Sequence, residues 1–212
     1  MPWQADHREQ TRARIVEAAA AAFREHGIDG IGIADLMRRA GLTHGAFYAY
    51  FASKDELVAE MERLVTEARR TRVAAALSER AQHEKLMAFA DMYLSSRHRE
   101  HPESGCMFAS LGGELARAEG PVRLRFDANI RAWLKQLTDY APARGAEIRR
   151  QQATGAYAAM IGGMILARGV EDPHTADRIL ADVRDFLRSA LNTEKPAPKR
   201  QTRRNARKIG AN

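Results

Sequence analysis

Apolar residues recur at spacings of three and four along most of the chain, which is the period of one face of an α-helix. The segment 8–26 shows this spacing first, and Gly27 follows it as a C-terminal cap. Later segments with the same period lie at 83–97, 106–116, 122–140, 147–168 and 173–191. No stretch keeps a period of two, so we predict an all-α fold.

Between residues 27 and 57 the elements are shorter. Helices are predicted at 34–40 and 44–51, and Gly41 supplies the turn between them. Ser53 and Glu56 form a capping box at the start of a long helix that runs toward residue 77. Two short helices joined by Gly-Leu-Thr are typical of a helix-turn-helix, whose second helix enters the DNA major groove.

The composition of 44–51 fits such a reading helix. Gly45 and Ala46 are small enough for close approach to base edges, and Ala46 could touch a thymine methyl. Aromatic or imidazole side chains with polar tips are expected at phosphate oxygens, namely those of His44, Tyr48 and Tyr50. Thr43 is predicted to cap the helix. Lys54 stands in the first turn of the next helix, where the dipole disfavours a cation, so a phosphate partner is expected for it.

The segment from about residue 12 to 57 resembles the DNA-binding domain of the tetracycline-repressor (TetR) family. The resemblance rests on 15–27 as the first helix, on Ala40-Gly41-Leu42-Thr43 at the turn, and on Gly45-Ala46-Phe47-Tyr48 and Ser53-Lys54-Asp55-Glu56-Leu57. Thr43, His44, Ala46, Tyr48, Tyr50 and Lys54 fall where the family contacts DNA. Two positions depart from its pattern: Ile31-Gly32 replaces a Thr or Ser pair, and Tyr50 replaces a frequent histidine.

The resemblance implies a dimeric, all-helical repressor. We therefore expect a helix-turn-helix domain at 1–57, a larger ligand-binding and dimerisation domain at 58–192, and a disordered tail at 193–212. The tail holds seven Lys or Arg and one Glu, which accounts for +6 of the net charge of +7. It is either a nonspecific phosphate contact or a solvated extension without a dedicated partner.

A ligand pocket requires an apolar concavity with a few polar groups. Its candidate lining in the second domain is Phe89, Met92, Tyr93, Cys106, Phe108, Trp133, Tyr157 and Met160. Core packing explains each of these residues equally well. The implied ligand is a small apolar or electrophilic molecule, and no cofactor is expected.

Cys106 is the chain's single cysteine, which excludes an internal disulfide. It follows Ser104-Gly105 at a predicted helix start, where the positive dipole end favours the reactive thiolate. Gly105-Cys106 with Leu111 and Glu114-Leu115 also resembles a TetR subgroup in which some members sense electrophiles or oxidants through that cysteine. A small buried hydrophobe is the alternative.

His98 and His101 have a spacing seen in metal ligands. A charged segment beside Pro102 favours a solvated loop there, so no metal site is predicted.

Dimerisation is predicted on the last two helices. Small residues there let helices approach closely, and the proposed interface consists of Gly155, Ala159, Gly162 and Ile165, with Ala156, Ile161, Gly163 and Leu166 beside them. A symmetric dimer would place two reading helices about 34–36 Å apart, one turn of DNA, on a palindromic operator.

The predicted function is a ligand- or redox-responsive repressor that a small molecule or electrophile releases from DNA. A helical protein-binding adaptor that does not recognise DNA is the alternative. An enzyme is not expected, because no phosphate-binding glycine loop, metal motif or nucleophile with an orienting base is evident. The longest apolar run, 156–167, is shorter than the roughly 20 residues of a membrane span, and no signal peptide is evident. We expect a cytoplasmic protein.

Overall fold

The computed structural model describes the backbone of residues 2–191 and the side chains from His7 onward. Every regular element in this range is helical, which confirms the all-α prediction. The elements are α1 (Pro2–His26), α2 (Ile33–Arg39), η1 (His44–Ala49), α3 (Lys54–Ala76), α4 (Lys85–Tyr93), α5 (Ser96–Glu100), η2 (Pro102–Ser104), α6 (Met107–Arg117), α7 (Gly120–Tyr140), α8 (Ala146–Gly169) and α9 (Pro173–Leu191). The predicted basic tail lies outside the described residues.

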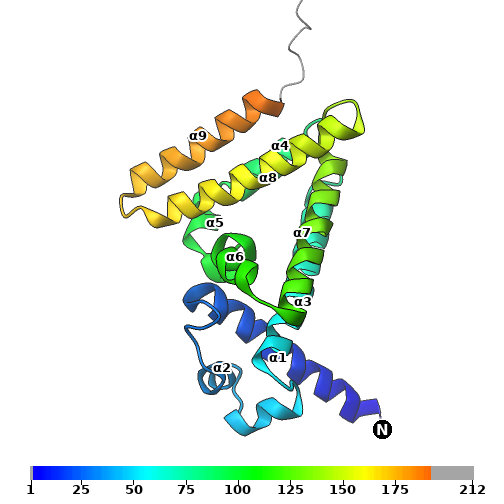
Figure 1. Cartoon of the computed structure of the whole chain (residues 1–212), viewed down its shortest axis with the longest axis vertical. Coiled ribbons are helices and arrows are strands. Elements are labelled where there is room, and N and C mark those ends of the chain that lie inside the picture. The colour runs from blue at the N-terminus through cyan, green and yellow to red at the C-terminus, as the bar shows by residue number, and fades with distance from the viewer. Residues whose placement is uncertain (1, 192–212) are drawn as a thin grey trace, which may run out of the picture.

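The helices form two connected parts (Figure 1). The small N-terminal part, made of α1, α2, η1 and the start of α3, lies at one end of the molecule, and we call it the reading head. Helices α8 and α9 pack against each other at the opposite end. Helices α3 and α7 run side by side between the two ends, and α6 contacts α1, α7 and α8. The rest of α3 and the elements that follow it are called the body below.

Helix α3 crosses residue 57, the predicted domain boundary, without interruption. Its start matches the prediction in part. The Ser53 hydroxyl accepts a hydrogen bond from the Glu56 amide at 3.1 Å. The Glu56 carboxylate, however, accepts from the Ala52 amide at 2.7 Å rather than from the Ser53 amide of an ideal capping box. The reading head and the body therefore share one helix, and their division into two domains stays a prediction.

Two predicted helices differ from the structure. The segment 83–97 breaks after α4, because Leu94 leaves the helical conformation and Ser95 caps α5 by accepting from the His98 amide at 3.3 Å. The break turns the His98 ring into the interior. The segment 44–51 forms a short 3-10 helix instead of an α-helix, and the Thr43 hydroxyl does not cap it. Tight turns of this kind are common in helical pieces of so few residues.

The interface between α3 and α7 encloses a carboxyl group. Glu62 of α3 has no exposed surface, and neither of its side-chain oxygens has a hydrogen-bond partner. The neighbouring Asn129 of α7 donates to the Glu62 backbone carbonyl at 3.2 Å. Burial raises the pKa of Glu62 to about 8, against smaller opposing effects of Asn129 and the Arg125 charge. Glu62 is therefore mostly protonated at neutral pH.

Candidate nucleic-acid interface and effector-binding regions

The turn between α2 and η1 is fixed by backbone hydrogen bonds. Gly41 has φ of 71°, which an L side chain rarely adopts. Its amide donates to the Arg38 carbonyl at 3.0 Å, and the Leu42 amide donates to the Met37 carbonyl at 2.8 Å. These two bonds form a Schellman motif, which ends α2 and sets the direction in which η1 leaves it.

Helix η1 has an inner and an outer face. Phe47 and Phe51 are buried, and their rings pack 5.8 Å apart. Thr43, His44 and Gly45 are exposed, and Tyr48 is 60% exposed with its ring edge against Phe47. Ala46 and Tyr50 are half-buried. Phe47 and Phe51 anchor η1 to the core. The polar and small residues on its other face form one accessible surface.

Arginines of α1 hold this surface in place. Arg8 donates to the Ala49 carbonyl at 2.9 Å, and Arg14 donates to the Ala40 carbonyl at 2.6 Å. Arg12 pairs with Glu60 of α3 at 2.5 Å and lies 4.6 Å from the centre of the Phe51 ring. The C-terminal ends of α2 and of η1 are thus both attached to the first helix, which orients the exposed residues before any ligand arrives.

Lys54 has a structural role that sequence reasoning missed. Its ammonium group donates to the Ile31 carbonyl at 2.7 Å and lies 5.6 Å from the centre of the Phe23 ring. These contacts explain a cation at the start of α3 and tie that helix to the segment before α2. The phosphate contact of Lys54 stays a prediction. At the start of α2, Gly32 is the N-cap without a side-chain hydrogen bond, as its departure from the family pattern leads one to expect.

The reading head is attached to the body at the C-terminal end of α1. Gly27 ends α1 with φ of 81°, and the following amide of Ile28 donates to the Glu114 carboxylate of α6 at 2.8 Å. Arg24 donates to the Glu103 carbonyl of η2, and Arg69 of α3 donates to the Ser104 carbonyl at 3.3 Å. A shift of α6 or η2 would therefore reach α1 through direct hydrogen bonds.

Seven of the eight predicted ligand-pocket residues lie in one buried group, which comprises Phe89, Tyr93, Cys106, Phe108, Trp133, Tyr157 and Met160. Their rings fill the space between them. Trp133 stacks on Phe89 at 5.6 Å and on Tyr157 at 5.9 Å between ring centres. Met92 is not part of this group, because its side chain lies on the outside of α4 and is 48% exposed. A ligand at this group would have to displace packed rings.

The thiol of Cys106 is 3% exposed and lies beside the hydroxyl groups of Tyr93 and Tyr157. Neither hydroxyl oxygen has a partner of good hydrogen-bond geometry within the described residues. Burial raises the pKa of both tyrosines well above the ordinary value, and the neighbouring thiol adds to this effect. Three polar groups thus meet inside an otherwise apolar core.

His98 holds Cys106 in this position. The His98 Nε2 atom accepts from the Cys106 amide at 2.8 Å, and its Nδ1–H group donates to the Tyr93 carbonyl at 2.7 Å. Acceptance at Nε2 requires the neutral ring with its proton on Nδ1. Burial lowers the pKa of His98 to about 4, with smaller contributions from Arg69 and Arg168 against the Tyr93 hydrogen bond.

His101 instead faces outward, 3.2 Å from Glu103. Among the residues that the structure describes, there is no group of three or more His, Cys, Asp or Glu that could hold a metal ion.

Helix α8 separates the small residues of the predicted dimer interface into two faces. A Cβ atom built on Gly155 or Gly162 would meet no other atom within 4 Å, Ala159 is half-buried, and Ile165 is 49% exposed. A Cβ atom on Gly163 would instead lie 3.0 Å from Val183 of α9, and Ala156 is buried. The prediction for Gly163 and Ala156 was therefore wrong, because these two residues pack inside the protomer.

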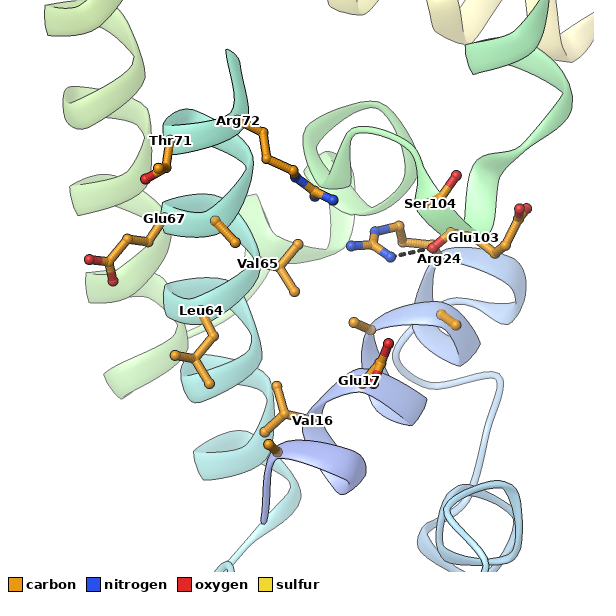
Figure 2. A pocket seen from close by; sticks show the side chains of 14 residues that line it. Val16, Glu17, Arg24, Leu64, Val65, Glu67, Thr71, Arg72, Glu103 and Ser104 are labelled. Atoms are coloured by element: carbon orange, nitrogen blue, oxygen red, sulfur yellow. Dashed lines mark hydrogen bonds between the residues drawn. The ribbon is translucent and has the colours of Figure 1, made fainter. Parts of the chain in front are cut away.

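A cleft of about 790 Å³ lies between α1, α3 and η2 (Figure 2), and none of its lining residues belongs to the aromatic group. Its walls are mainly apolar, and its lining comprises Ala13, Val16, Glu17, Ala20, Ala21, Arg24, Leu64, Val65, Glu67, Ala68, Thr71, Arg72, Glu103 and Ser104. Sequence reasoning did not predict this cleft, because its residues come from three separate segments that only the tertiary structure brings together.

Comparison with known proteins agrees with this architecture. Residues 15–61 match the family model for bacterial regulatory proteins of the tetR family, and residues 82–183 match the model for a tetracyclin repressor-like C-terminal domain. Within the described residues no helix has the length and apolar character to cross a membrane.

Among individual proteins, the transcriptional regulator BetI of Agrobacterium fabrum is 31% identical over 162 residues, which are 73% of this chain and 75% of that protein. The regulator TtgR of Pseudomonas putida is 46% identical over 50 residues, 24% of each chain, so the match spans about a quarter of that relative.

Solved structures extend the likeness over the whole fold. The reduced form of NemR from E. coli has a TM-score of 0.70 at 22% identity and covers 83% of this chain and 96% of its own. A TetR regulator from Chloroflexus aurantiacus has a TM-score of 0.71 at 25% identity and covers 86% and 96%. Two family models together match most of the chain, and BetI is 31% identical over 73% of it. The chain therefore belongs to the TetR family of bacterial transcriptional regulators.

Proposed function

We propose that this protein is a homodimeric repressor that binds a palindromic DNA operator through η1 and leaves it when a small molecule binds. The observation that carries the proposal is the division of η1 into buried anchors, Phe47 and Phe51, and an exposed surface at Thr43, His44, Gly45 and Tyr48. A surface helix that only completed a bundle would have no reason to keep glycine and alanine at its outer N-terminal end. Ala46 and Tyr50 complete the proposed contact.

The second element of the proposal is the outer face of α8. Gly155 and Gly162 leave open space, while Ile165 and Leu166, 49% and 61% exposed, supply apolar surface beside them. Phe186 on the adjoining α9 is 62% exposed. Small residues next to exposed large ones suit close helix packing between two copies of the chain, in which each copy fills the other's gaps. In such a dimer the two reading heads would lie at the ends opposite the interface.

The inducer is proposed to act on the body, and an electrophile would act at Cys106. Its thiol is enclosed with two hydroxyl groups that lack partners, so a ligand that reached them would gain hydrogen bonds inside the aromatic core. Mass spectrometry after mild treatment with an electrophile should detect one adduct at Cys106. An unmodified thiol together with unchanged DNA affinity would remove the electrophile from the proposal. Because its proposed partner is DNA, we place the protein in the cytoplasm.

The test is selection of bound fragments from host genomic DNA, followed by fluorescence anisotropy against salt. We expect a short palindrome to be enriched, with affinity that falls steeply as salt rises because phosphate contacts release counterions. Gly45→Leu should lower affinity for that palindrome by roughly a factor of ten or more, since a wrong base contact costs about 1–3 kcal/mol. The substitution has space in the free protein, so thermal stability should stay unchanged.

Leu124→Ala serves as the matched control, because this α7 residue is 74% exposed and lies outside the reading head. It should leave DNA affinity unchanged. If no sequence is enriched above scrambled DNA, the proposal fails and the adaptor alternative takes its place.

A further inference from the structure

The cleft between α1, α3 and η2 has an apolar part and a cationic part. Figure 2 shows Val16 from α1 and Leu64 and Val65 from α3 along its two walls, while Arg24 and Arg72 extend toward each other near Ser104. The volume of about 790 Å³ lies in the range of small-molecule sites, which is about 300–1,000 Å³. An occupant must therefore be apolar along most of its length and polar at one end.

The arginines at this end lack carboxylate partners. Arg24 and Arg69 each donate to a neutral backbone carbonyl of η2, at Glu103 and Ser104. The Nε atom of Arg24 is buried without a partner, and Arg72 makes no hydrogen bond or ion pair with the part of the chain that the structure describes. Three guanidinium groups thus share one region in which their charges repel.

The strain of this arrangement is visible in Arg24. Burial, with the charges of Arg69 and Arg72 as further contributions, lowers the pKa of its guanidinium to about 10 against opposite effects of Cys106 and Glu103. A bound anion would reverse both effects by supplying a partner and neutralising the repulsion. Charge-assisted hydrogen bonds to a carboxylate are also the strongest that arginine makes.

The carboxylates of the lining are directed elsewhere. The Glu103 side chain pairs with His101 at 3.2 Å, and Glu67, 68% exposed, pairs with Arg63 at 3.5 Å. Glu17 lies on the α1 wall between Val16 and Arg24 (Figure 2), so an anionic group is disfavoured midway and favoured at the arginine end.

We propose that this cleft binds an amphipathic organic carboxylate, with its apolar body between the α1 and α3 walls and its carboxylate at Arg24 and Arg72. Such a ligand contacts α1 of the reading head and α3 of the body at once. It would shift operator affinity only to the extent that it binds one relative position of these helices more tightly than another. That consequence rests on the proposed function, whereas the binding itself does not.

Binding is measured on the purified full-length protein without DNA, by isothermal titration calorimetry with decanoate, decylamine and 1-decanol below their micelle concentrations. The three probes share one apolar tail and differ in charge. Decanoate should bind once per chain and at least roughly tenfold more tightly than decylamine, since one charge-assisted contact is worth about that factor. Equal affinity for the anion and the cation would overturn the proposal.

Two pairs of variants locate the site. Arg72→Gln should weaken decanoate binding roughly tenfold, whereas Arg178→Gln, an exposed arginine on α9, should not change it. Ala68→Trp should fill the apolar wall and abolish binding with all arginines intact, whereas Ala75→Trp, exposed two turns further along α3, should not. The proposal is wrong if either member of the cleft behaves like its control. Because no DNA is present, failure of the repressor proposal would leave this result intact.

Discussion

Replacing Glu62 with glutamine should stabilise the protein, by an amount that grows with pH. The carboxyl group has no exposed surface and no hydrogen-bond partner for either oxygen, and burial raises its pKa from 4.5 to about 8. The folded chain therefore keeps this proton over a pH range in which the unfolded chain loses it. Stability from the protonated form is fully present below pH 4.5 and is lost as pH rises toward 8.

The magnitude follows from the size of the pKa shift. Each pH unit between the unfolded and folded values removes about 1.4 kcal/mol from the free energy of unfolding. The loss is about 1 kcal/mol at pH 5 and roughly 4 kcal/mol at pH 8. Glutamine has nearly the same shape and no proton to lose, so the difference between Glu62→Gln and the native protein should increase by roughly 3 kcal/mol over this range.

Urea unfolding at pH 5, 6, 7 and 8, at one protein concentration, measures this difference. Only its change with pH is used, so the fixed cost of burying an amide in place of a carboxylic acid cancels. Glu67→Gln is the matched control, because the Glu67 side chain on the same helix is 68% exposed, and its difference from the native protein should stay flat. A constant difference for Glu62→Gln would show that Glu62 is ionised and solvated in the folded protein, and the account of the α3–α7 interface would be refuted.

Three further predictions concern the body, the dimer interface and the reading head. The His98 ring must be neutral to accept from the Cys106 amide, so its contribution to stability is present above pH 6.5 and is lost as pH falls toward 4, by roughly 3 kcal/mol at pH 4. Urea unfolding should show this acid-dependent loss in the native protein and not in His98→Gln. A parallel loss in both proteins would contradict the assignment. Gly162→Leu should abolish the dimer in sedimentation experiments without lowering protomer stability, whereas Gly163→Leu should destabilise the protomer by about 1–3 kcal/mol, and the opposite pattern would move the interface elsewhere. Lys54→Met should cost about 1 kcal/mol of thermal stability through the lost bond to the Ile31 carbonyl, and an unchanged melting temperature would show that this bond contributes nothing.

Local features of the fold could be predicted from sequence because each depends on neighbouring residues. The turn after α2 needs a residue tolerant of positive φ, and Gly41 marks it. Ser53 marks the start of α3 through one hydrogen bond to the Glu56 amide. The spacing of Phe47 and Phe51 identified the buried face of η1. What the spacing could not show was that η1 is a 3-10 helix, since apolar positions four apart fit both kinds of helix.

The candidate sites depend on contacts between distant segments, and here sequence reasoning reached less far. An external phosphate was predicted for Lys54, and the Ile31 carbonyl, 23 residues earlier, is a partner that sequence reasoning missed. The sequence could not distinguish Gly162 from Gly163 as a residue of the dimer interface. Only the position of Val183 of α9 shows that Gly163 packs inside the protomer. The arginine end of the cleft unites Arg24 of α1 and Arg72 of α3, with the Arg69 charge nearby, and only the tertiary structure brings these two helices together.

The bond from the Ile28 amide to the Glu114 carboxylate bears on how family members can be recombined. A chimera that joins residues 1–57 of this chain to the body of another regulator would keep the whole surface proposed to contact DNA. It would lose the acceptor for Ile28 and the η2 carbonyl that receives Arg24, unless the new body supplies them. The piece of this protein that can be transplanted with its geometry intact therefore extends through α6, to Arg117, rather than ending where the helix-turn-helix ends.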